Sequence, residues 1–236
     1  MIFKPRLDIL PAAQQRLWPE LKPACRHGFV LYGGTAIALR LGHRPSVDFD
    51  FFSENPLDRE AIKLAFPFLS ASTVLQDEAN AFSVVVPYAD SNHSHVKVSF
   101  FGTIGFGRVG KPEMTDDQVM QVASLDDLMA TKLKVVLQRA EAKDYRDVAE
   151  MINAGVSLAK GLASAHEIFG PNFQPSESLK ALSYFGDGDL KTLSQSVKTS
   201  LVKAVSAVRA LPAVAILSRS LGGEVNERDG RSGNTE

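Results

Sequence analysis

The sequence predicts an α+β protein, in which a small mixed β-sheet core with helices is followed by an α-helical C-terminal domain. Short runs rich in β-branched and aromatic residues are confined to the first half of the chain, whereas the pattern from Ser124 onward is helical. With 44% hydrophobic and 22% charged residues over 236 positions, the composition is that of a globular protein. We expect a core over residues 1–115, a helical domain over 116–222 and a disordered tail over 223–236.

Four strand-like runs make up the N-terminal half. They are bounded by turn-forming residues and cover residues 29–32, 47–52, 82–86 and 96–101. A helix interrupted by Pro19 and Pro23 precedes them, and a polar helix is expected at about residues 57–69. We expect one sheet with helices on one of its faces.

A glycine pair, Gly33-Gly34, follows the first strand. Glycine lets the backbone turn tightly and approach a ligand closely, and Thr35 adds a hydroxyl. Residues 35–41 form a short helix that Gly42 closes, so its free N–H groups and positive dipole end face the turn. An anion fits there, most simply a triphosphate. We therefore expect Gly33, Gly34 and Thr35 to bind a nucleotide.

An acidic pair, Asp48 and Asp50, lies on the second strand. Side chains two residues apart leave the same face of a strand, so both carboxylates point the same way. They repel each other and resist ionisation unless a cation lies between them. Mg²⁺ fits this pair because it takes oxygen ligands from one or two carboxylates and from substrate phosphates, and Mn²⁺ is an alternative. An isolated Asp-x-Asp is more often a solvated strand edge, and the upstream glycine turn favours the metal site.

These motifs together resemble the signature of the polymerase-beta-like nucleotidyltransferase superfamily, carried here by Gly33, Gly34, Thr35, Asp48 and Asp50. Thr35 replaces the usual serine and keeps its hydroxyl. The run over residues 126–149, a helix carrying a lysine followed by Lys-Asp-x-x-Asp, more narrowly resembles the AbiEii/AbiGii type of nucleotidyltransferase toxin. The two motif blocks cover residues 29–52 and 126–149, and the rest of the chain is less specific.

The resemblance implies a magnesium-dependent enzyme that transfers a nucleoside monophosphate from an NTP to a hydroxyl and releases pyrophosphate. It also implies an RNA acceptor, in the first place the 3′ end of tRNA, and a cognate antitoxin as partner of a toxin in a toxin–antitoxin or phage-defence system. Transfer to a protein or small-molecule hydroxyl, or a nucleotide-binding module without catalysis, remains open. The sequence has no signal-peptide core and no apolar run of ~18 residues, so we expect a cytoplasmic protein away from membranes.

Lys132 lies in the middle of the apolar arc of the helix that starts at Leu125, and Lys134 lies opposite, at 100° per residue. Such a lysine either extends its amine along apolar surface to solvent or aims it into a cleft. The resemblance places a functional lysine at this position. We therefore expect Lys132 to bind and neutralise nucleotide phosphates.

Asp144 and Asp147, three residues apart, edge one face of the next helix. From the residues alone they are acids near a helix N-terminus that pair with Lys143 or Arg146. The resemblance gives Asp144 an active-site role and leaves Asp147 a structural one.

Ser99 occupies the strand position where many members of the superfamily carry a third carboxylate as the base. Serine cannot act as that base unaided. Either Asp144 supplies the carboxylate, positioning and electrostatics suffice, or the protein is catalytically weak. Residues 190–223 carry basic residues and no acid, which suits either an RNA backbone or a solvated helix face.

Overall fold

The computed structural model describes residues 2–88 and 95–223, so the predicted tail, apart from Gly223, lies outside the described residues. Within these residues the sheet has eight strands in the order β1-β7-β8-β2-β3-β6-β5-β4. The strands are β1 (Ile2–Phe3), β2 (Val30–Tyr32), β3 (Asp48–Phe52), β4 (Thr73–Glu78), β5 (Ala81–Pro87), β6 (His95–Phe101), β7 (Glu113–Thr115) and β8 (Gln121–Val122). β3 pairs antiparallel with β2 and parallel with β6, so the sheet is mixed as predicted.

The helices follow the sequence pattern, with breaks that local chemistry explains. They are α1 (Ala12–Leu17), α2 (Gly33–Leu41), α3 (Arg59–Ala65), α4 (Leu125–Val135), α5 (Ala142–Asn153), α6 (Leu158–Phe169), α7 (Pro175–Ser183) and α8 (Gln195–Ala207). The predicted helix over 57–69 is divided at Phe66, because the residue before a proline is disfavoured in α-helical geometry. α8 begins only after Ser194, whose side chain accepts a hydrogen bond from the Val197 N–H as an N-cap.

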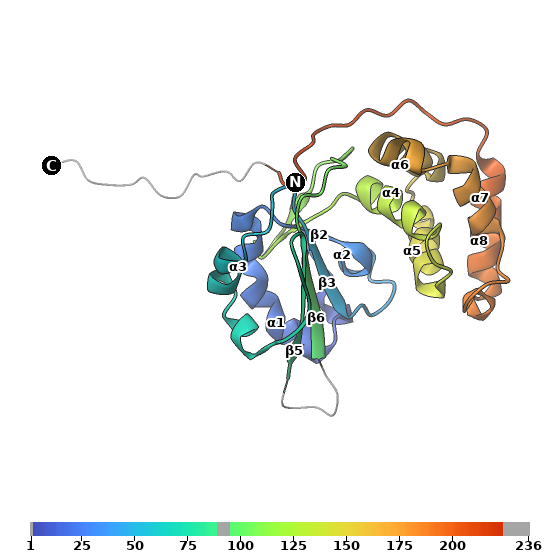
Figure 1. Cartoon of the computed structure of the whole chain (residues 1–236). Coiled ribbons are helices and arrows are strands. Elements are labelled where there is room, and N and C mark those ends of the chain that lie inside the picture. Colours follow the sequence, from blue (N-terminus) through green and yellow to red (C-terminus); the bar gives the residue numbers. More distant parts are fainter. Residues whose placement is uncertain (1, 89–94, 224–236) are drawn as a thin grey trace.

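Helices lie on both faces of the sheet. Figure 1 shows α1 and α3 on one side and α2 on the other, with α4 and α5 beyond α2. The expectation of helices on one face is therefore wrong. The reason lies in β3, where buried Phe49 and Phe51 alternate with Asp48 and Asp50, so that one face needs an apolar cover and the other carries the acids.

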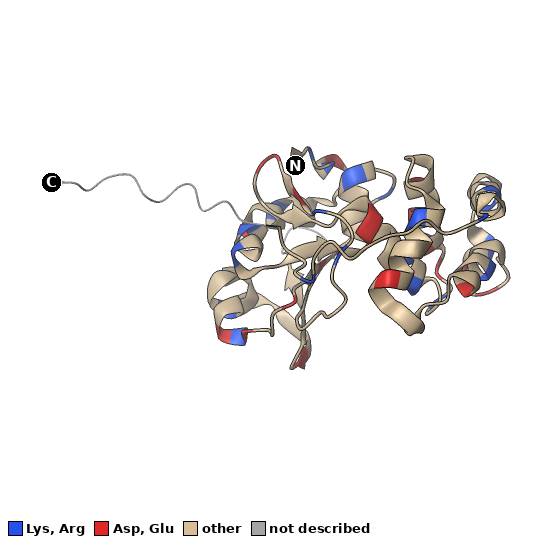
Figure 2. Ribbon diagram, turned by 90° about the horizontal axis from the view of Figure 1, so that it is seen from above, with Lys and Arg blue, Asp and Glu red and all other residues tan. Residues whose placement is uncertain are grey.

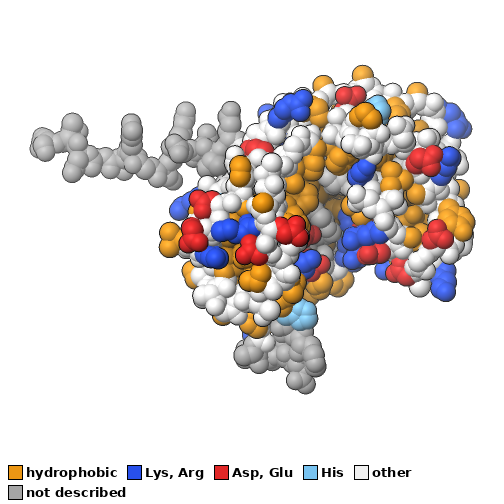
Figure 3. All heavy atoms as spheres, in the orientation of Figure 1, with side chains coloured by type: hydrophobic (Ala, Val, Ile, Leu, Met, Phe, Trp, Pro, Cys, Tyr) orange, Lys and Arg blue, Asp and Glu red, His pale blue; other side chains and the backbone are white. Residues whose placement is uncertain are grey.

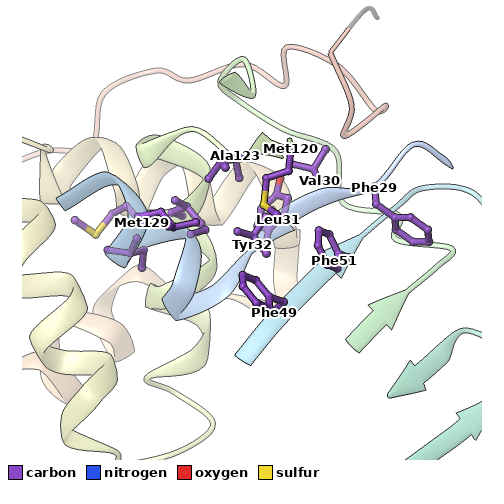
Figure 4. Packing of buried hydrophobic residues seen from close by; sticks show 14 of the residues in the cluster. Phe29, Val30, Leu31, Tyr32, Phe49, Phe51, Met120, Ala123 and Met129 are labelled. Carbon is purple, nitrogen blue, oxygen red and sulfur yellow. The ribbon is translucent and has the colours of Figure 1, made fainter. Parts of the chain in front are cut away.

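An aromatic core fixes the position of the central strands (Figure 4). The Phe51 ring lies 6.3 Å from that of Phe29 and 5.5 Å from that of Phe100, centroid to centroid, and Phe49 packs 6.2 Å from Trp18 after α1. Burying each such side chain stabilises the fold by about 1.5–3 kcal/mol. The strand that carries Asp48 and Asp50 is thus anchored along its opposite face.

The sheet part and the helical part are connected at several points. β8 lies beyond the predicted boundary at residue 115 and pairs with β2 and β7, so the sheet extends past it, and the division into domains stays a prediction. Past α8, an extended segment returns to the sheet part, where Ser218 pairs with Arg108 and Leu221 is buried (Figure 1). Basic and acidic residues are interspersed over both parts (Figure 2). Among residues 2–88 and 95–223 no helix has the length and apolar character needed to cross a membrane.

Candidate active site

The glycine turn leads directly from β2 into α2. Gly33 has a φ of +76°, which favours glycine, and a Cβ there would lie 2.9 Å from Asp50 Oδ2. A Cβ on Gly34 would lie 2.5 Å from Arg44 Nη2. The two glycines therefore let the turn lie against Asp50 on one side and Arg44 on the other. The free N–H groups of the helix N-terminus are at this turn, because α2 begins at Gly33.

Thr35 connects the turn to the acidic strand. Its side chain is buried, and its hydroxyl donates to the Asp48 carbonyl oxygen and is hydrogen-bonded to Ser46 Oγ over 2.8 Å. The Thr35 hydroxyl, which was expected to bind a nucleotide, thus forms its hydrogen bonds with Ser46 and Asp48 of the protein. Its direct effect is to hold the start of β3 against α2.

Asp48 and Asp50 point to the same face of β3, as predicted from their spacing. Burial, and next the charge of Asp48, raise the pKa of the Asp50 carboxyl, while Lys97 and Lys132 oppose the rise. A cation between the carboxylates would relieve this repulsion. In the described part of the chain no third His, Cys, Asp or Glu completes a cluster, so Mg²⁺ would take its other ligands from water and substrate phosphates, as it commonly does. The donor set therefore fits magnesium.

Lys132 extends from α4 into a buried cluster of charges. Its Nζ lies 2.5 Å from Asp144 Oδ1 and 2.8 Å from Asp147 Oδ2, both on α5. The two carboxylates have no exposed surface and the lysine side chain is 7% exposed. A lysine held by two acids in this way has a fixed position, and the alternative that it extends to open solvent is not what the structure shows.

Asp147 is the centre of this cluster, and sequence reasoning left it a structural role. It accepts hydrogen bonds from Arg44 Nε (2.6 Å) and Nη2 (2.8 Å), and its Oδ1 lies 2.7 Å from His43 Nε2. Burial alone would raise the pKa of its carboxyl, but these hydrogen bonds and the charge of Lys132 outweigh it and hold the pKa well below the usual range. Asp147 therefore fixes Arg44 beside the glycine turn.

Asp144 faces Lys132 and Arg139. Arg139 Nε donates to Asp144 Oδ2 over 2.8 Å. Burial would raise the pKa of this carboxyl, but the hydrogen bond from Arg139 and the charge of Lys132 lower it overall. A carboxylate that two cations stabilise in its ionised form is a weak base. The contacts suit a residue that positions Lys132 and Arg139.

Ser99 and Lys97 lie on β6 beside the acidic strand, where the register pairs Ser99 with Asp50 and Lys97 with Asp48. The Ser99 hydroxyl is fully buried without a partner in good hydrogen-bond geometry, yet it is near enough to lower the pKa of Asp50. The strand position at which many members of the superfamily carry a third carboxylate thus lies beside the acidic pair. Lys97 was missed, although strand alternation places it on the same face as Ser99.

These residues surround one cavity of about 370 Å³ between the sheet part and the helical part, here called the site cavity. Figure 3 shows the molecule hollowed in this region. Its charged and polar wall includes Gly34, Thr35, Arg44, Ser46, Asp48, Asp50, Lys97, Lys132, Arg139 and Lys143. Of the residues predicted from sequence, Asp144 lies behind the wall and Gly33 borders a neighbouring cavity. Cations outnumber acids along this wall, which suits a polyphosphate.

Several wall residues were not found from the sequence. Arg44 lies between Thr35 and Asp48 in the first motif block, and Arg139 lies between Lys132 and Asp144 in the second. Neither has a spacing that predicts its place, and only the fold brings both to the cavity. Lys134, predicted to lie opposite Lys132, borders the neighbouring cavity, where its Nζ donates to the Asn172 carbonyl oxygen. None of the basic residues over 190–223 borders the site cavity in the described structure.

The sequence model of the family described as nucleotidyl transferase AbiEii toxin, type IV toxin–antitoxin system, matches residues 17–204. The chain belongs to this family. The match includes both motif blocks and every residue of the site cavity wall, and the resemblance drawn from the motifs is confirmed. The family is thus described as one of nucleotidyltransferase toxins.

One sequence relative and two solved structures are similar to this chain. An uncharacterized protein of Aquifex aeolicus (strain VF5) is 31% identical over 122 residues, which span 51% of the AbiEii chain and about half (55%) of the relative. A crystal structure from H. pylori, of a protein classed as a nucleotidyltransferase, has a TM-score of 0.52 at 17% identity and covers 82% of this chain and 92% of its own. MenT4, a nucleotidyltransferase toxin of Mycobacterium tuberculosis H37Rv, has a TM-score of 0.48 at 12% identity over 81% and 82% of the two chains. The H. pylori structure confirms the fold class.

Proposed function

We propose that this AbiEii chain transfers a nucleoside monophosphate from an NTP to a hydroxyl of RNA, with release of pyrophosphate, and that Asp48 and Asp50 hold magnesium for this reaction. The observation that carries the proposal is the convergence of the glycine turn, the acidic pair and Lys132 on one cavity. The three come from β2–α2, β3 and α4, so the fold brings together groups that are far apart in the sequence.

Different residues of the site cavity would bind the phosphates and the metal. The N–H groups at the start of α2 and the ammonium of Lys132 bind and neutralise the triphosphate. Arg44, fixed by Asp147, and Arg139, fixed by Asp144, add charge-assisted hydrogen-bond donors at the wall. Magnesium, when bound to the acidic pair, would neutralise charge on the phosphates and lower the pKa of the attacking hydroxyl. Catalysis would then depend mainly on positioning and electrostatics, because no third carboxylate of the described residues lines the cavity.

RNA is the proposed acceptor, and the 3′ end of tRNA is its first candidate. The five basic side chains of the wall, against two acids, support an anionic acceptor beside the anionic nucleotide; they are Arg44, Lys97, Lys132, Arg139 and Lys143. Among the described residues, neither Lys97 nor Lys143 forms an ion pair with a carboxylate of this cavity. Lys143 pairs instead with Glu141 at the surface. An antitoxin as partner is proposed from family membership.

The test is label transfer. The purified protein is incubated with each α-labelled NTP, Mg²⁺ and either tRNA, tRNA lacking its 3′ end, or no RNA. Label in intact tRNA alone supports the proposal. Label in the protein or in a small molecule would establish the alternative acceptors. NTP binding without any transfer, in the wild type and with a cell extract as acceptor source, would establish the inactive binding module instead.

A further inference from the structure

A second cavity, of about 260 Å³, adjoins the site cavity and is here called the aromatic cavity. The two cavities share the residues Gly34, Asp50, Phe52, Lys132 and Arg139. A ligand held by its phosphates in the site cavity therefore lies beside the aromatic cavity, with Phe52 at the border of the two. None of the roles proposed above for the transfer of the nucleoside monophosphate uses this second space.

The walls of the aromatic cavity are rings from both parts of the molecule. Tyr32 and Phe52, on β2 and β3, stack with centroids 5.0 Å apart at an angle of 14°. Phe106 lies 6.3 Å from each of them, and Phe169 at the end of α6 lies 5.4 Å from Phe106. The three phenylalanines are half-buried, so part of each ring surface stays open to the cavity. Apolar pockets with a few polar groups are the usual sites of planar organic ligands.

We propose that the aromatic cavity binds the nucleobase of the NTP whose triphosphate occupies the site cavity, an inference that rests on the proposed function. The shared wall favours this occupant, because a base and its triphosphate are parts of one molecule. Base stacking on aromatic rings is worth about 1–3 kcal/mol per base, and every base has a face that stacks. Phe106 and Phe169 are the rings that this assigns to the base.

Lys134 adds selectivity to the stacking. Its ammonium donates to the Asn172 carbonyl oxygen and lies 5.9 Å from the Phe169 ring centroid. An ammonium has three donors, so two remain for the ligand. Guanine, cytosine and uracil offer carbonyl oxygens to such a donor, whereas adenine accepts only at its ring nitrogens. The aromatic cavity should therefore bind ATP less well than the other three NTPs.

The test compares the four NTPs with inorganic tripolyphosphate, which has no base, by titration calorimetry with Mg²⁺ and the full chain. Phe106→Ala and Phe169→Ala should each weaken NTP binding by about tenfold, the change that 1.4 kcal/mol of stacking gives, and leave tripolyphosphate binding unchanged. Lys134→Met should reduce the preference for GTP, CTP and UTP over ATP. Tripolyphosphate binding also shows that each variant is folded.

Phe185→Ala and Lys180→Met serve as matched controls, since a half-buried phenylalanine and an exposed lysine outside both cavities should change neither probe. If Phe106→Ala does not fold, Phe106→Leu keeps the bulk without the ring and should still lower the ratio of NTP to tripolyphosphate affinity. An unchanged ratio in the Phe106 and Phe169 variants would overturn the inference and leave the proposed function standing. If the wild type binds neither the NTPs nor tripolyphosphate, both this inference and the proposed function are overturned.

Discussion

Lys132 on α4 and Asp144 on α5 are joined by a 2.5 Å contact between Nζ and Oδ1 that is shielded from solvent. The pair connects the two helices that follow the sheet, and it places the ammonium at the wall of the site cavity. Asp147 holds the same ammonium from its other side over 2.8 Å. One lysine thus takes part both in the packing of the helical part and in the charge of the site.

Replacing Lys132 should therefore affect both transfer and stability. Lys132→Met keeps the apolar stem and removes the ammonium, and we expect nucleotide transfer to fall by about 10²-fold or more, the usual cost of one lost electrostatic donor. Because Asp144 and Asp147 keep their arginine partners, stability should fall by only about 1–3 kcal/mol. Label transfer and thermal unfolding measure the two effects. Lys160→Met, which removes an exposed pair with Asp126, is the control and should be near silent in both. Full transfer by Lys132→Met would remove the lysine from the mechanism.

Replacing either acid of the pair should also lower transfer, but it should not lower stability. Asp48→Ala and Asp50→Ala should each lower transfer by about 10²-fold or more, because several kcal/mol of charge stabilisation are lost with the metal site. Thermal stability should stay the same or rise, since burial and next the repulsion from Asp48 raise the pKa of Asp50, and either variant removes the repulsion. Chelation by EDTA should stop wild-type transfer and restoring Mg²⁺ should recover it. Either alanine variant with wild-type transfer would show that the pair is not the metal site.

The glycine turn offers a test with a close control. Gly33 and Gly155 both have positive φ, +76° and +92°, so Gly33→Ala and Gly155→Ala carry the same kind of backbone strain, about 1–2 kcal/mol. Only at Gly33 does the new Cβ meet an acid, Asp50 Oδ2 at 2.9 Å, and at Gly155 nothing lies within 4 Å. Both variants should unfold at lower temperature, and only Gly33→Ala should lose transfer. Equal activities of the two would mean that the turn serves the fold alone.

Local patterns predicted the central part of the site because spacing determines it. The two-residue spacing of Asp48 and Asp50 fixes their common face, and the 100° step of a helix places Lys132 inward. Contacts between distant segments have no such local signal. Arg44 reaches Asp147 across 103 residues of chain, a partner that the predicted structural role of Asp147 did not include. The short strands β1, β7 and β8 were likewise missed, because two or three residues carry no measurable alternation, and β4 was missed because its largely exposed residues show no apolar face.

Asp147 should make stability depend on pH in the acidic range. Its folded-state pKa is depressed, so its contribution is fully present above the unfolded value of about 3.9 and is lost as the pH falls toward the folded value. Asp147→Asn leaves Arg44 and Lys132 without this charge, and we expect a loss of about 3 kcal/mol or more at pH 7. Thermal unfolding at a series of pH values should show the difference from wild type shrinking below about pH 4. A difference that stays constant down to the lowest pH would contradict the ion-pair assignment.

The role of Asp144 separates two accounts of how the acceptor hydroxyl loses its proton. If Asp144 were the base that replaces the carboxylate missing at Ser99, Asp144→Asn would lower kcat by about 10²–10⁴-fold, leave KM for the NTP unchanged and remove the acidic limb of the pH–rate profile. The contacts with Lys132 and Arg139, which lower the pKa of Asp144, favour a positioning residue instead.

For a positioning residue, we expect Asp144→Asn to lower kcat/KM by about 10- to 100-fold, the equivalent of the 1.5–3 kcal/mol of a charged hydrogen bond. KM for the NTP should rise, because Lys132 and Arg139 are released from their places at the wall, and the shape of the pH–rate profile should not change. Ser99→Ala, beside Asp50, should change transfer little, because its hydroxyl holds no partner in good geometry. If Asp144→Asn loses the acidic limb of the pH–rate profile and keeps its KM for the NTP, Asp144 is the base. If Ser99→Ala loses most of its transfer activity, the strand position takes part in the reaction instead.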